Sequence, residues 1–195
     1  MLFRSVKEEI LQSKKDSYDI LFAGNTKYIE GASALLKAFT RLKENFPRLK
    51  LHIIGMQESD LGTLPEGVAC YGYLDKGKED ERETYYRLFK ESKVFINTTP
   101  RWAGFSATAE AMYFYLPVLI SPYDEFTATF GETINFGYYC RENSPVVIEE
   151  AVIKIFNHDA YELLCVNAHN AVKEFTWNVY MDKLINKTEA LNEPN

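Results

Sequence analysis

The chain has 195 residues, of which 46% are hydrophobic, and this is enough to build one substantial core, so we expect a single domain over residues 1–195. Its 22 basic and 28 acidic residues leave a net charge of −6, which disfavours general nucleic-acid binding because such binding needs a basic surface. An anionic ligand must therefore be held by local donors rather than by the overall field of the protein.

Cysteine usage and hydropathy predict the compartment. Three scattered cysteines without C-x-x-C spacing indicate reduced thiols and no zinc site. The first ten residues, MLFRSVKEEI, lack the apolar stretch of a signal peptide, and the longest apolar run, residues 111–120, is interrupted by Pro117 and is too short to span a bilayer. We therefore expect a cytoplasmic protein, without a metal or other cofactor, that contacts a membrane only indirectly, as a peripheral protein.

Buried strands alternate with amphipathic helices along the chain. Strands are predicted, in order, at residues 18–23, 51–55, 68–74, 94–98, 117–121 and 137–139. Helices are predicted from Gly31 to Pro47, around residues 85–89, from Ser106, and at 145–156, 159–175 and 178–191. Residues 75–83 are dominated by charge and are interpreted as a solvated loop and the start of a helix, and residues 122–136 as a loop. The terminal segments, 1–17 and 178–195, are expected to form peripheral helices.

This alternation predicts an α/β protein with a Rossmann-like parallel sheet of about six strands and helices on both faces. Such sheets bind ligands beyond the carboxyl ends of their strands, which places the candidate site in the loops that follow the first four strands. These loops cover residues 25–30, 56–60, 73–77 and 99–105. No G-x-G-x-x-G sequence follows the first strand, which disfavours a dinucleotide-binding enzyme.

The stretch GFSATAEAMYFYLPVLIS, residues 104–121, is typical of a turn, a short helix that carries Glu110, a stop at Pro117 and a buried strand. A helix that opens at Ser106 directs its N–H groups toward a ligand, which suits a phosphate. The backbone of Phe105, Ser106 and Ala107 would make these contacts, so they do not depend on the side chains.

The ordered set of motifs resembles the donor-binding, C-terminal half of the family 4, or group 1, glycosyltransferases, which have the GT-B fold. The resemblance extends from about Asp19 to Leu184. It rests on LFAG before a loop closed by Gly31, the Pro-x-Leu-x-Leu-x-Ile-x-Gly pattern from Pro47 to Gly55, VFINTTP, the Glu110-Ala-Met helix followed by PVLIS, a Gly-Glu loop at 131–132, and FTW at 175–177.

The resemblance implies half of a retaining transferase that needs no metal and takes a nucleotide-sugar as its substrate. The sugar would pass to a glycan or lipid-linked acceptor in cell-surface polysaccharide or glycolipid assembly. Because the active site of this family lies between two Rossmann-like halves, we expect the chain to be inactive without an N-terminal, acceptor-binding half in the same or another chain.

Two parts of the resemblance carry binding roles to this sequence. Glu110 matches the second glutamate of the family's paired motif, which contacts the donor's ribose, and a carboxylate can accept two hydroxyl hydrogen bonds at once. Tyr73 and Leu74, after Gly72, match the segment whose backbone reads the base, although a role at a strand edge and in the core explains them equally well.

Other family side chains are replaced. The first glutamate of the pair falls on Trp102, so the carboxylate that would contact the donor sugar is missing. The arginine after Gly24 and the lysine before Gly31, which hold the diphosphate in the family, are Asn25 and Glu30 here. By its place in this loop, the resemblance still makes Gly24, together with Asn25, a candidate donor-binding residue.

A carboxylate at position 30 beside a diphosphate would be repelled by roughly 3 kcal/mol per charge pair at a separation of ~5 Å. Lys27 and Arg101 are the nearby cations that could substitute, although both could equally be surface residues.

Tyr115 stands where the family usually has a glycine at the end of the helix. A tyrosine in a left-handed cap costs about 1–2 kcal/mol, so we expect this helix to end in a different way. His52 lies in an apolar strand and is interpreted as structural, whereas His158 and His169 are interpreted as helix-surface residues.

The replaced side chains support an alternative hypothesis: a degenerate, non-catalytic transferase-like module with a binding or regulatory role. This alternative predicts no nucleotide-sugar binding and a partner surface over the same cleft. A third possibility is another doubly wound α/β enzyme whose resemblance is limited to the fold. The transferase is favoured because the matching pattern is long and Glu110 is retained.

Overall fold

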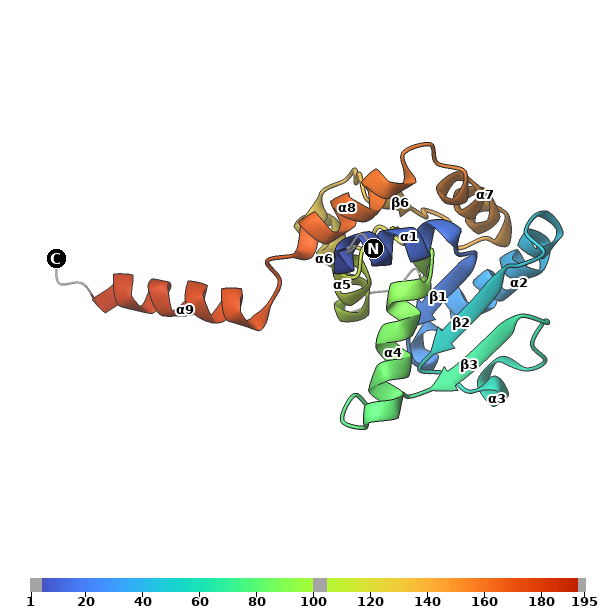
Figure 1. The fold of residues 1–195 in the computed structure, drawn as a ribbon, viewed down its shortest axis with the longest axis horizontal. Helices are drawn as coiled ribbons and strands as arrows, with labels where there is room; N and C mark the ends of the chain where they lie inside the picture. The colour runs from blue at the N-terminus through green and yellow to red at the C-terminus, as the bar shows by residue number, and fades with distance from the viewer. Residues whose placement is uncertain (1–4, 100–104, 193–195) are drawn as a thin grey trace.

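One six-stranded parallel sheet, in the order β3-β2-β1-β4-β5-β6, forms the centre of the molecule in the computed structural model, which describes residues 5–99 and 105–192 (Figure 1). The predicted α/β architecture is confirmed. The strands are β1 (Asp19–Ala23), β2 (Lys50–Ile54), β3 (Val68–Gly72), β4 (Val94–Asn97), β5 (Val118–Ile120) and β6 (Gly137–Tyr139).

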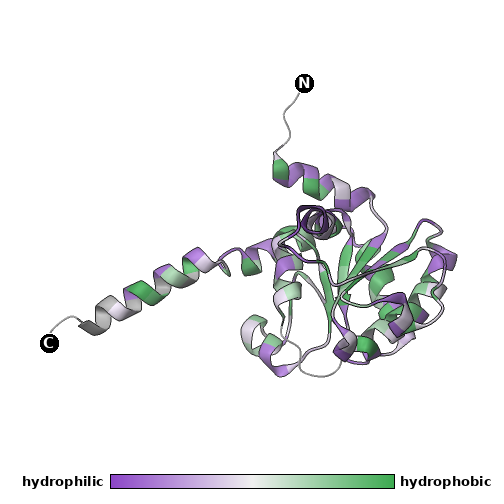
Figure 2. Cartoon of the chain, turned by 90° about the horizontal axis from the view of Figure 1, so that it is seen from below, coloured by the Kyte–Doolittle hydropathy of each residue, from purple (hydrophilic) through white to green (hydrophobic). Residues whose placement is uncertain are grey.

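Helices lie before, between and after the strands. They are α1 (Val6–Asp16), the 3₁₀ turn η1 (Thr26–Tyr28), α2 (Ile29–Asn45), α3 (Glu58–Leu61), α4 (Glu79–Glu91), α5 (Ser106–Tyr113), α6 (Asp124–Phe130), α7 (Pro145–Phe156), α8 (Tyr161–Val172) and α9 (Trp177–Asn192). α9 extends away from the rest of the molecule (Figures 1 and 2).

The two faces of the sheet pack into two apolar clusters. Ile20 and Phe22 of β1 join the cluster that includes buried residues of α2 and α7, whereas Leu21 and Ala23 join the cluster that includes residues of α4 and α5. Because both faces are covered, the strands are continuous apolar runs instead of alternating ones. This double burial explains why strand positions were predictable from the sequence.

Two short helices were not predicted. The segment 122–136, interpreted as a loop, contains α6, and the loop after β2 contains α3. In α6, Phe126 is fully buried and its ring contacts that of Phe130 at a centroid distance of 4.5 Å, one turn further on. A helix of two turns presents too few apolar positions to reveal its period in the sequence.

The sequence also predicted a third strand that is too long. β3 ends at Gly72, whose φ of 62° turns the chain, so Tyr73 and Leu74 lie in the loop beyond the strand. Tyr73 is largely exposed there.

The end of α5 corrects the expectation for Tyr115. Its φ is 62°, so tyrosine does occupy a left-handed cap. The Tyr115 N–H donates to the Met112 carbonyl at 2.9 Å and the Leu116 N–H to the Ala111 carbonyl at 3.0 Å, which is the Schellman arrangement. The Tyr115 ring stacks on that of His169 in α8 at 4.1 Å and 6°. This stack offsets part of the strain of the cap.

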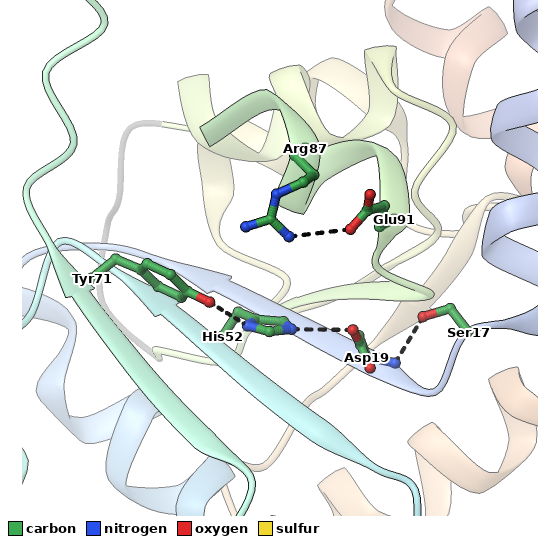
Figure 3. Close-up of polar contacts among 6 residues, drawn as sticks. All are labelled: Ser17, Asp19, His52, Tyr71, Arg87 and Glu91. Atoms are coloured by element: carbon green, nitrogen blue, oxygen red, sulfur yellow. Dashed lines mark hydrogen bonds and ion pairs between the residues drawn. The ribbon is translucent and has the colours of Figure 1, made fainter. Parts of the chain in front are cut away.

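The three histidines have different surroundings from one another. His52 hydrogen-bonds the Tyr71 hydroxyl at 2.9 Å and an Asp19 carboxylate oxygen at 3.2 Å, as Figure 3 shows, in accord with a structural role. His169 is not a simple surface residue, since it is half-buried and its Nδ1 lies 2.7 Å from the Tyr113 carbonyl oxygen. His158 lies in the connection between α7 and α8 rather than in a helix.

We predict that Tyr115→Gly is more stable than Tyr115→Ala by about 1 kcal/mol, because both variants lose the stack on His169 but only alanine keeps the left-handed strain. Urea denaturation of the two variants measures this difference. Equal stability, or a more stable alanine variant, would show that the cap is not strained.

Two lysines join α1 to α4. The fully buried Lys14 donates through Nζ to the carbonyls of Phe89 and Ser92, at 2.7 and 3.2 Å, at the end of α4. Lys93 donates in return to the Lys15 carbonyl at the end of α1, at 2.8 Å. Lys14 therefore donates to carbonyls at the C-terminal end of α4, and Lys93 to a carbonyl at the C-terminal end of α1, where a helix supplies no N–H partner of its own. Burial lowers the pKa of Lys14 well below its usual value, although the neighbouring Cys165 and Glu91 oppose this shift.

The lowered pKa of Lys14 predicts a pH-dependent stability. Between the folded-state pKa and the unfolded value of about 10.4, the unfolded chain binds more protons at this position, so its contribution to stability rises with pH. In Lys14→Met this contribution is absent. The free energy of unfolding of the wild type minus that of Lys14→Met should therefore increase between pH 7 and pH 9.5 in denaturant titrations, and a constant difference would contradict the lowered pKa.

Candidate functional site

A cleft of about 600 Å³ opens where the order of the strands reverses, beside the carboxyl ends of β1 and β4. Its walls are the loop after β1, the end of β2, the loop from Tyr73 to Lys76 and the first turn of α5. Doubly wound sheets bind their ligands at this position, because the chain leaves the two central strands in opposite directions and the following loops separate.

Two glycines bring the elements around the cleft close together. A Cβ on Gly31, in the first turn of α2, would lie 2.6 Å from Thr99 Oγ1 and 2.8 Å from the Thr99 nitrogen. Gly55 has a φ of +94°, and a Cβ there would lie 2.6 Å from the Gly24 carbonyl oxygen. Larger residues at either position would push apart the loops that follow β1, β2 and β4.

The N-terminus of α5 faces the cleft with Ser106, Ala107 and Thr108. Among the described residues, the first hydrogen bond of the helix runs from the Ala109 N–H to the Phe105 carbonyl at 2.8 Å. The N–H groups of residues 106–108 thus precede the hydrogen-bonded ladder, where a helix offers donors and partial positive charge to an anion.

Glu110 lies at the centre of a polar cluster. Lys76 Nζ contacts both carboxylate oxygens of Glu110, at 2.6 and 2.8 Å, and lies 4.2 Å from the centroid of the Tyr85 ring. The Tyr85 hydroxyl donates to Glu110 Oε2. Burial, followed by this hydrogen bond, raises the pKa of Tyr85, so the phenol remains a protonated donor.

Lys76 was missed in the sequence. It lies in the loop after β3 among charged residues that were interpreted as a solvated run, and the ion pair joins it to a residue 34 positions away. Its position could have identified it, because Lys76 is a cation in the third of the four loops at the carboxyl edge of the sheet.

The cleft brings together six of the predicted site residues. Those that line it are Gly24, Asn25, Tyr73, Leu74, Ser106 and Ala107. The carboxylate of Glu110 is connected to it through Lys76 and Tyr85, which also line it.

Other predicted residues lie elsewhere. The Phe105 ring packs edge-on against Phe126 and Phe130 of α6, so this residue offers the site its backbone alone. Lys27 and Glu30 are exposed and do not line the cleft. The Lys27 N–H donates to Asn25 Oδ1 at 3.0 Å, which caps η1. Arg101 and Trp102 lie outside the described residues.

The position of Glu30 changes the expected electrostatics. Glu30 stands in the first turn of α2, where the partial positive charge of a helix N-terminus favours a carboxylate. Because its side chain does not line the cleft, the repulsion expected for a diphosphate at ~5 Å does not follow from this structure.

Within residues 5–99 and 105–192, no group of three or more histidine, cysteine or acidic side chains is placed to hold a metal ion. In the same part of the chain, every helix is too short or too polar to cross a membrane.

The strand order and the cleft define a Rossmann-like α/β domain with a candidate ligand site at the strand-order reversal. Comparison with known protein families agrees with this fold. The profile of the family described as glycosyl transferases group 1 matches residues 3–174. The chain therefore belongs to the group 1 glycosyltransferases, as the motifs from Asp19 onward indicated. No curated protein sequence matches the chain.

Solved glycosyltransferase structures share the fold. The pneumococcal O-GlcNAc transferase GtfA, in complex with UDP and GlcNAc, has a TM-score of 0.70 at 15% identity, over 90% of this chain and 36% of that protein. HepE from Anabaena, in complex with UDP and glucose, has a TM-score of 0.69 at 14% identity, over 95% of this chain and 53% of that protein. The chain thus spans between about a third and a half of these proteins and resembles the C-terminal domain of the GT-B fold.

We predict that Lys76→Met changes the free energy of unfolding by less than about 1 kcal/mol. The side chains of Lys76 and Glu110 are each 38% exposed, and an ion pair at such exposure contributes little to stability. Urea denaturation of the variant beside the wild type measures the change. A loss above about 2 kcal/mol would show that the pair holds the fold together.

Proposed function

We propose that this chain is the donor-binding domain of a retaining glycosyltransferase that transfers a sugar from a nucleotide-sugar to a glycan or lipid-linked acceptor. The observation that carries the proposal is the cleft at the strand-order reversal, bounded by the first turn of α5, with Glu110 one turn further along that helix. Two structural neighbours are in complex with UDP together with a sugar, which supports a nucleotide-sugar as the ligand class.

Each part of the cleft matches one part of such a donor. The N–H groups of residues 106–108 bind phosphate oxygens. Glu110 accepts hydrogen bonds from the ribose hydroxyls, and Tyr85 holds its carboxylate in place. The backbone at Tyr73 and Leu74, which line the cleft, contacts the base.

Sugar transfer requires more than this cleft. We propose that a second Rossmann-like half, in the same or another polypeptide, binds the acceptor and completes the active site, so that this chain alone does not turn over. The full enzyme would act without a metal in polysaccharide or glycolipid assembly, in the cytoplasm or peripherally at the inner membrane surface. Measurable sugar transfer by this chain alone would contradict the proposed need for a second, acceptor-binding half.

Saturation-transfer NMR of the purified chain against UDP, GDP, ADP and their glucose conjugates tests donor binding. We expect one of the three nucleotides to bind and Glu110→Ala to weaken that binding by about tenfold, because the ribose loses its hydrogen-bond acceptor. Glu150→Ala, at an exposed position on α7, is the matched control and should bind as the wild type does.

The alternative function, a degenerate module without catalysis, predicts that the chain binds none of the three nucleotides. Asn25 uses its side chain to cap η1, and no cation of the β1 loop lines the cleft, as a degenerate binding module would show. Absence of binding by all three nucleotides would contradict the donor-binding proposal and favour this module.

A further inference from the structure

A nucleoside diphosphate in the cleft needs a positive charge that the protein as a whole does not supply. The net charge of the chain is −6, and Asp75 is among the residues that line the cleft. Of the described residues that line it, Lys76 alone is a cation. Among the described residues of the cleft, Lys76 is therefore the side chain that can compensate for the charge of the phosphates.

We propose that Lys76 is the phosphate-binding cation of this cleft and that it changes partners when the nucleotide binds. The inference rests on the proposed donor-binding function. In this structure the ammonium pairs with both oxygens of Glu110. In the bound state Glu110 accepts the ribose hydroxyls, and the ammonium contacts the phosphate oxygens.

Hydrogen bonds hold the backbone around Lys76 in place, so only its side chain needs to move for the ammonium to change partners. Asp75 Oδ1 accepts from the Gly77 N–H at 2.9 Å, and the Asp75 N–H donates to Glu81 Oε2 at 2.6 Å. The Lys76 carbonyl accepts from Arg82 at 3.3 Å. The ammonium itself is held by Glu110 and by the face of the Tyr85 ring.

The first turn of α5 lies near the partner that now holds the ammonium. Glu110 follows Ser106 by four residues in α5, so the Cα atoms of these two residues are about 6 Å apart along the helix axis. The flexible four-carbon stem of a lysine can cover such a shift by rotation about its side-chain bonds. Because the ion pair is 38% exposed on both sides, its exchange for a phosphate contact meets little resistance.

Tyr85 keeps the carboxylate ready after the exchange. Its hydroxyl donates to Glu110 Oε2, independently of Lys76. The carboxylate therefore stays oriented when the ammonium moves away, and its remaining acceptor positions can receive the ribose hydroxyls.

The test compares a nucleoside diphosphate with its nucleoside, which lacks the phosphates. The probes are the diphosphate that the wild type binds among UDP, GDP and ADP, and the corresponding uridine, guanosine or adenosine. We expect Lys76→Met to bind the diphosphate at least about tenfold more weakly, since a charge-assisted contact is lost, and the nucleoside within about twofold of the wild type. Lys78→Met, two residues away and exposed, is the matched control and should bind both probes as the wild type does.

Two further variants separate a phosphate contact from a side effect of exposing Glu110. Lys76→Arg keeps the charge and should restore most of the diphosphate affinity. The double variant Lys76→Met/Glu110→Gln has no unpaired carboxylate and should bind the diphosphate more weakly than Glu110→Gln alone, which keeps the lysine. Equal affinity of these two variants would overturn the inference, because the loss in Lys76→Met would then come from repulsion by Glu110.

The remaining outcomes distinguish this inference from the proposed function. If the wild type binds a diphosphate and Lys76→Met binds it equally well, the inference is overturned while the donor-binding function stands. If the wild type binds none of the three diphosphates, the proposed function fails, and the inference fails with it.

Discussion

Burial of the sheet on both faces is the constraint on which the rest of the structure depends. Because the strands are covered on each side, they are built mainly from apolar residues, and functional groups collect in the loops at their ends. The order β3-β2-β1-β4-β5-β6 reverses between β1 and β4, which separates the loops after these strands and opens the cleft there. The ion pair of Lys76 with Glu110 at this cleft follows from that topology, since β3 and α5 deliver the two residues to the same edge.

The parts of the fold that could be predicted are those that continuous local patterns encode. Apolar runs between turn residues located all six strands, and the small residues before Glu110 located the start of α5 at Ser106. The parts that could not be predicted depend on contacts distant in the sequence. Tyr115 adopts a left-handed φ, and the stacking of its ring on His169 offsets part of the strain. The short helix α6 is stabilised mainly by the burial of Phe126 in the core.

The candidate site shows the same division. The turn and helix around Glu110 and the backbone at Tyr73 were identified from motif order, and the structure gathers them around one cleft. The electrostatics of the site were not predictable residue by residue. Glu30, expected to oppose an anion, does not line the cleft, and Lys76, read as part of a solvated loop, does. Whether a loop side chain takes part in such a site depends on the three-dimensional path of its loop, which local sequence patterns do not reveal.

The most direct test is a set of two-dimensional ¹H–¹⁵N NMR titrations of the chain with UDP, GDP and ADP in turn, followed at the backbone amides. We predict that one of the three nucleotides shifts residues 106–108 and Tyr73 to Lys76 most, while the amides of α7, on the opposite face of the sheet, remain unchanged. Shifts confined to other parts of the molecule, or no shifts with any of the three at millimolar concentration, would contradict the claim that this cleft is a nucleoside diphosphate site.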